Sequence, residues 1–136
     1  MKLIPVDHAP AVVVCSTCRF SKEEREDEGG RRGGALLLDA LVAAQAAEPA
    51  FAGVAVQAMP CLFACTESCT VHLRGPGKVG YVMGRFAPDA DAAHAILDYA
   101  ARFAASETGQ VPFREWPAGV KGHFITRTPP EGFVVE

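Results

Sequence analysis

The stretch Ala11-Val12-Val13-Val14-Cys15-Ser16-Thr17-Cys18 carries the strongest fold signal in the sequence. Four apolar residues without a polar interruption, three of them β-branched, are typical of a short strand that is buried on both faces. This apolar run leads directly into two cysteines that are separated by two residues. We therefore expect a buried strand that leads into a Cys-x-x-Cys pair at its carboxyl end.

The residues that follow predict a helix and a second strand. Residues 19–34 are polar and glycine-rich, which indicates a long loop. Residues 35–47 are rich in leucine and alanine and are followed by Pro49, so they predict a buried helix. Residues 51–58 alternate in polarity and predict a strand. A strand–helix–strand unit favours two parallel strands joined by a right-handed crossover.

The second half of the chain predicts a hairpin and a second helix. Residues 70–74 and 79–86 flank the turn Gly75-Pro76-Gly77-Lys78 and indicate antiparallel strands. Pro88, with acidic residues after it, predicts a helix start, and Gly109 predicts the helix end. The helix should face the core with a stripe of apolar residues: Ala93, Ile96, Leu97, Ala100, Phe103 and Ala104.

This element order predicts an α/β fold of the thioredoxin-like type, β-α-β-β-β-α. We expect one domain over residues 1–136, with its core at about 11–106 and an irregular tail over 107–136. The tail has no clear period, so we expect it to wrap over the domain on three aromatic anchors: Phe113, Trp116 and Phe124.

Composition and charge exclude several classes of protein. Of the 136 residues, 49% are hydrophobic and 21% are charged, which is an ordinary globular balance. The net charge of −3 gives no basic face for a nucleic acid. No apolar stretch approaches the length of a membrane span, and Met1–Pro10 lacks the apolar core of a signal peptide. We therefore expect a cytoplasmic protein.

Five cysteines in a cytoplasmic chain indicate metal or redox chemistry, because thiols stay reduced there and five cannot all pair. Cys15 and Cys18 follow the first predicted strand, and Cys61, Cys65 and Cys69 follow the second. The carboxyl ends of neighbouring parallel strands lie at the same edge of a sheet. The two groups of cysteines should therefore converge.

Spacing alone leaves three interpretations of these cysteines open. Two short cysteine pairs can hold a structural zinc ion tetrahedrally, which would make the chain a partner-binding module. The same pairs suit an iron–sulfur cluster, which needs four thiolates. A Cys-x-x-Cys pair after a strand is also found in thiol–disulfide oxidoreductases, although Cys18 is followed here by a long polar loop.

The segment Cys61-Leu62-Phe63-Ala64-Cys65, followed by Val71-His72-Leu73, a glycine turn, residues 81–88 and a helix, resembles the second half of thioredoxin-like 2Fe–2S ferredoxins. It is similar also to the small subunit of respiratory NADH dehydrogenase. Over about residues 11–130 the chain resembles a bacterial family of small predicted metal-binding proteins. Members share the Cys-x-x-Cys-Arg start, the three-cysteine loop and two tail elements, here Val111–Arg114 and Arg127–Pro130.

The resemblance implies a 2Fe–2S cluster on Cys15, Cys18, Cys61 and Cys65, with Cys69 as an alternative ligand. The ferredoxins space their first pair more widely and usually have proline at the Cys69 position. The implied function is one-electron transfer without substrate chemistry of its own. Thiolate ligation gives an expected potential of about −400 mV, as in plant-type ferredoxins.

Partners are expected from the resemblance and from the surface of the chain. An electron carrier needs redox partner proteins, and the acidic run Glu23–Glu28 is either a docking patch for one or a plain solvated loop. Thioredoxin-like ferredoxins tend to be homodimers, and the exposed edge of the predicted hairpin could pair with a second chain. The resembled bacterial family is associated with cobalamin biosynthesis and cobalt handling, which suggests a pathway by analogy.

Overall fold

The computed structural model describes residues 1–136 and contains one five-stranded sheet. β1 (Ala11–Cys15) is flanked by the parallel strand β2 (Ala55–Met59) and the antiparallel strand β3 (Val71–Arg74). β4 (Gly80–Met83) and β5 (Phe124–Thr128) continue the sheet with antiparallel pairings, giving the order β2-β1-β3-β4-β5. The predicted parallel pairing of the first two strands and the predicted hairpin are confirmed, and together they place the Cys-x-x-Cys segment at the end of an interior strand.

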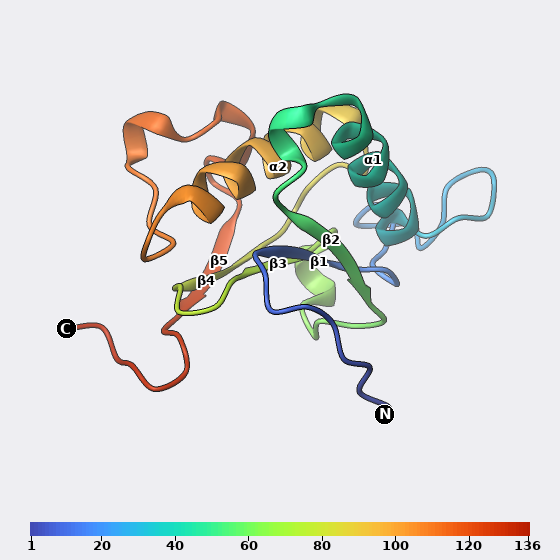
Figure 1. Ribbon diagram of the computed structural model, residues 1–136. Coiled ribbons are helices and arrows are strands. Elements are labelled where there is room, and N and C mark those ends of the chain that lie inside the picture. Colours follow the sequence, from blue (N-terminus) through green and yellow to red (C-terminus); the bar gives the residue numbers. More distant parts are fainter.

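Two helices pack against each other over one face of this sheet (Figure 1). α1 spans Gly33–Ala47 and α2 spans Ala90–Ala105. The carboxylate of Asp89 accepts a hydrogen bond from the N–H of Ala92 at 2.9 Å, which caps α2 at the predicted start. α2 ends at Ala105 and not at Gly109, because the N–H of Ser106 already closes the last turn by bonding to two carbonyls of that turn.

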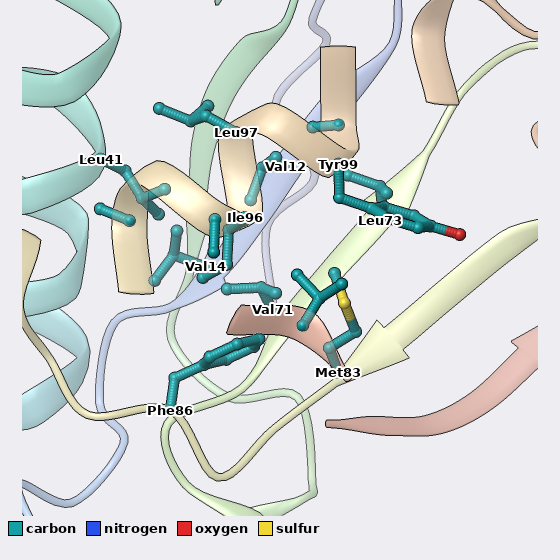
Figure 2. Close-up of a cluster of buried hydrophobic side chains, with 14 of the residues drawn as sticks. Val12, Val14, Leu41, Val71, Leu73, Met83, Phe86, Ile96, Leu97 and Tyr99 are labelled. Atoms are coloured by element: carbon teal, nitrogen blue, oxygen red, sulfur yellow. The ribbon is translucent and has the colours of Figure 1, made fainter. Parts of the chain in front are cut away.

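The hydrophobic core lies between the helices and the sheet (Figure 2). Alternate residues of the strands point to this face, and the predicted stripe of α2 meets them. Ala104 is only half-buried, whereas Tyr99, which the stripe did not include, is fully buried. The largest fully buried side chains are Tyr99, Phe103, Leu37, Leu41, Leu73, Met83, Ile96 and Leu97.

The tail differs from the expectation, because it contributes a strand. β5 pairs with β4 and covers the hairpin edge that was expected to be exposed, so β2 and β5 form the two edges of the sheet. Trp116 and Phe124 pack against the core as expected, but Phe113 is 64% exposed and does not anchor the tail.

The remaining connections are short 3-10 turns at Pro49–Phe51, Cys65–Glu67, Phe113–Glu115 and Ala118–Val120. The first of these occupies part of the segment predicted as the second strand, which therefore begins at Ala55 and not at residue 51. None of the helices is long and apolar enough to cross a membrane.

Candidate metal centre

The first two cysteine segments are joined at the carboxyl ends of β1 and β2. Cys15 is the last residue of β1 and lies opposite Met59, the last residue of β2. The N–H of Ser16 donates to the carbonyl of Met59 at 2.9 Å, and the hydroxyl of Thr17 donates to the carbonyl of Pro60. Pro60 directly precedes Cys61, so these bonds fix the start of one cysteine loop against the other.

The third cysteine segment is tied to the same end of the sheet through Thr70. The N–H of Cys15 donates to the carbonyl of Thr70 at 3.1 Å. The hydroxyl of Thr70, which is fully buried, lies 3.3 Å from Sγ of Cys18. The thiol of Cys69 donates to the carbonyl of Arg19 at 3.4 Å. All five cysteines therefore lie in three segments held together by hydrogen bonds, as the strand order predicted.

The amino end of α1 packs closely against the Cys15–Cys18 loop. The N–H of Gly34 donates to the carbonyl of Cys18 at 3.1 Å. A Cβ atom on Gly34 would stand 1.9 Å from the carbonyl oxygen of Cys15, and one on Gly33 would stand 2.2 Å from that of Arg19. Only glycine permits these approaches. They bring the positive end of the helix dipole to the loop, where it favours negative sulfur.

Cys15 and Cys18 behave as a thiolate and its hydrogen-bond donor. Both side chains are buried. The contact with the Cys18 thiol lowers the pKa of Cys15 to about 5, against the opposing effect of burial and with support from the N–H groups of Leu62 and Thr17. The same contact, together with burial, raises the pKa of Cys18 above its ordinary value. The shifts in pKa therefore favour a single negative charge on this pair, at Cys15, with the proton at Cys18.

Cys61 and Cys65 form a second, more open pair. Cys61 is half-buried and Cys65 is exposed. The N–H of Phe63 donates to Sγ of Cys61 at 3.3 Å, and the backbone of Phe63 is left-handed, with φ of 58°. The negative charge of Cys61 and a side-chain hydrogen bond with it raise the pKa of Cys65. The two sulfurs are therefore neighbours.

Cys69 differs from the other four, because it is buried and donates its proton to a backbone carbonyl. Burial, with a smaller effect of the Cys15 charge, raises its pKa to about 12. The charge of Cys15 also contributes to the raised pKa of Cys65. Electrostatic contact thus links Cys15 to both other segments, although no three His, Cys, Asp or Glu side chains are arranged to hold a single metal ion.

Several features of the site were not predicted from the sequence. Thr70 follows Cys69 directly, but the neighbouring sequence does not predict that its hydroxyl lies against Cys18. The glycine-rich loop was expected to extend to residue 34. Gly33 and Gly34 in fact begin α1 and contact the loop backbone. The buried Nε of Arg19, next to Cys18, has no hydrogen-bond partner in the protein.

Residues 12–130 match the model of a family described as a protein of unknown function (DUF1636). The chain belongs to this family. The fold of this family member is similar to that of a thioredoxin-like [2Fe–2S] ferredoxin from Aquifex aeolicus. The TM-score is 0.56 and the identity 17%, covering 94% of this chain and all of the other. The thioredoxin-like ferredoxin fold expected from the sequence is thereby confirmed. A comparison with curated proteins finds no match.

The residues of the site fit an iron–sulfur cluster in their donor chemistry. All five candidate ligands are free thiols, and soft thiolates are the ligands that such clusters take. Backbone N–H groups of Leu62 and Phe63 lie against two of the sulfurs. N–H donors of this kind, together with a helix amino terminus, stabilise the negative charge of thiolates and sulfides.

Proposed function

We propose that this protein is a one-electron carrier that holds a 2Fe–2S cluster. Cys15, Cys18, Cys61 and Cys65 would be the ligands, and Cys69 would be an alternative. The single observation that supports this most is that hydrogen bonds join the three segments that carry the five thiols at one end of the sheet. A fold similar to that of a 2Fe–2S ferredoxin supports the same proposal.

The residues of the chain would hold and tune this group in three ways. Cys15 is already biased to the thiolate form, so little free energy is needed to deprotonate it for ligation. The N–H groups of Leu62 and Phe63 would offset negative charge at the sulfurs. Burial of the Cys15–Cys18 side would exclude water, while the exposed Cys65 would mark the side open to a redox partner. The cluster itself would supply the reversible one-electron couple.

Replacement of single cysteines tests the ligand assignment. We expect Cys61→Ser and Cys65→Ser to lose the cluster or to change its spectrum strongly, because each removes one of two thiolates on the same loop. Cys69→Ser is the matched control from that loop and should retain an unchanged spectrum, since its thiol is protonated and bonded to a carbonyl. The measurement is visible absorption with iron and sulfide counts on anaerobically purified variants.

Two outcomes of this series would contradict the proposal in different ways. An unchanged cluster in Cys61→Ser and Cys65→Ser would overturn the ligand set. A spectrum lost only in Cys69→Ser would move Cys69 from the alternative position into the ligand set. The acceptor or donor would be a redox partner protein, and the cobalamin or cobalt pathway is proposed only by analogy with the resembled family.

A second candidate function is that of a thiol–disulfide oxidoreductase using Cys15 and Cys18. The observation that favours it is the hydrogen bond between the two thiols, which lowers the pKa of Cys15 to about 5. A low-pKa thiolate beside a protonated partner is the arrangement that attacks disulfides. Turnover of a disulfide substrate that is lost in Cys15→Ser but retained in Cys61→Ser would favour this function over electron transfer.

A further inference from the structure

A groove outside the thiol site lies along β5 and is also lined by Tyr81 of β4. Its volume is about 730 Å³, within the range of small-molecule sites. Four successive residues of β5, Phe124–Arg127, line it. Because successive side chains of a strand point to opposite faces, a cavity touched by four in a row must follow the edge of the strand. The opposite wall is formed by residues 110–112 and Trp116.

The groove has a preformed aromatic wall. The ring of Phe124 lies 4.7 Å from that of Trp116 and 5.5 Å from that of Tyr81, measured between ring centroids. The indole N–H of Trp116 donates to the carbonyl of Val111 at 2.8 Å, which fixes the orientation of the ring. A flat ligand could therefore stack on this wall without first ordering it.

An unused hydrogen-bond donor lies directly behind this wall. The hydroxyl of Tyr99 is buried and has no partner in the protein, which is costly for a polar group. Its ring contacts Trp116 and Phe124 at centroid distances of 5.9 and 5.3 Å. In Figure 2 the hydroxyl is directed away from the aliphatic part of the core. The wall of the groove is thus backed by a polar group whose hydrogen bonding is incomplete.

The charge of the groove is positive. Arg127 lines it and makes no ion pair, whereas no aspartate or glutamate is among the lining residues. The side chains of Gln110 and Thr126 also line it, and neither makes a hydrogen bond within the protein. One unpaired cation with free amide and hydroxyl groups favours an anionic group at one end of a ligand.

We propose that this groove binds a small planar aromatic anion. The ring stacks on Trp116 and Phe124, and the carboxylate or other anionic group pairs with Arg127. The proposal uses none of the cysteines, so it stands whether or not the thiol site holds a cluster. It adds a ligand site at the β5 edge of the sheet, away from the β1–β2 pair whose carboxyl ends lead into the cysteine loops.

Trp116 is the only tryptophan of the chain, so its indole N–H gives a single reporter signal from inside the groove. The test is a nuclear magnetic resonance titration of the isotope-labelled full chain with naphthoate and with its neutral analogue naphthamide. We expect a saturable shift of the indole signal, with naphthoate bound about fivefold more tightly than naphthamide because one exposed ion pair is added.

Two variants distinguish the ion pair with Arg127 from nonspecific binding of the probe. Arg127→Gln should remove the preference for naphthoate and leave naphthamide binding unchanged. Arg114→Gln, which changes an exposed arginine outside the lining, should preserve the preference. The proposal is overturned if neither probe gives a saturable shift at Trp116. A preference that persists in Arg127→Gln, or is lost in Arg114→Gln, also overturns it.

Discussion

Replacing Gly34 by alanine should destabilise the protein, although alanine normally favours a helix. Gly34 is the second residue of α1, and an added Cβ would stand 1.9 Å from the carbonyl oxygen of Cys15 and 2.8 Å from the carbonyl carbon of Ser16. Both neighbours are backbone atoms of the cysteine loop. Restoring a separation of 3.0 Å, the shortest that real Cβ atoms keep, would move the helix from the loop by about 1.1 Å.

The free energy of unfolding decides which effect dominates. An alanine in place of glycine gains up to about 1 kcal/mol of helix propensity, and less at the first turn. Overpacking against backbone costs about 1–3 kcal/mol and occasionally more. The displacement would also stretch the 3.1 Å hydrogen bond from the N–H of Gly34 to the carbonyl of Cys18. We expect a net loss of about 2 kcal/mol, because a backbone contact cannot be relieved by a rotamer change.

Urea unfolding of the metal-free, reduced protein measures this loss. With a slope of about 2 kcal/mol per molar urea, the midpoint should fall by about 1 M. Gly53→Ala is the matched control, because a Cβ there meets nothing within 4 Å, and it should be neutral or slightly stabilising. If Gly34→Ala is as stable as Gly53→Ala, the proposed contact between α1 and the cysteine loop is refuted.

Three further predictions concern Phe63, Tyr99 and Cys15. Phe63→Gly should raise the free energy of unfolding by about 1 kcal/mol, because glycine adopts the left-handed conformation of this position without strain. Phe63→Ala is its control and should be neutral in the same urea assay, since alanine keeps the strain and the side chain it replaces is 94% exposed. Tyr99→Phe should raise the thermal midpoint, because it removes a buried hydroxyl without a partner, whose burial costs about 1–3 kcal/mol. A lower midpoint would contradict this. The pKa of Cys15 is 9.0 in the unfolded state and about 5 in the folded state. Ionisation of this thiol therefore stabilises the folded, metal-free protein increasingly as the pH rises from about 5 to 9. The difference in urea midpoint between the wild type and Cys15→Ser should therefore grow from about pH 6 to about pH 8, and a constant difference would show that Cys15 is not ionised.

Short-range sequence patterns correctly predicted the strands and the helix in which they occur. The uninterrupted valines of β1, the glycine turn after β3 and the helix start near Pro88 each act within a few residues, and the structure confirms all three. β5 was missed because Phe124–Thr128 is flanked by glycine and proline and forms a strand only by pairing with β4, about 40 residues earlier in the chain. Phe113 was expected to pack because aromatics usually do, but of the three aromatic residues only Trp116 and Phe124 pack against the core.

The convergence of the cysteine segments could be predicted, because parallel strands end at the same edge. The partners of each thiol could not, since they depend on contacts between distant segments. The hydroxyl of Thr70 reaches Cys18 across 52 positions, and the thiol of Cys69 reaches the carbonyl of Arg19 across 50. Which four cysteines act together thus depends on packing that no single motif encodes.

The most direct test of the electron-carrier proposal is a spectrum of protein purified without air. Absorption and electron paramagnetic resonance are recorded with iron, sulfide and zinc counted on the same sample. We expect a brown protein with near-equal iron and sulfide and a rhombic signal on reduction. A colourless protein with one zinc ion would contradict it and would make the cysteines of Cys15–Cys18 and Cys61–Cys69 a structural clamp.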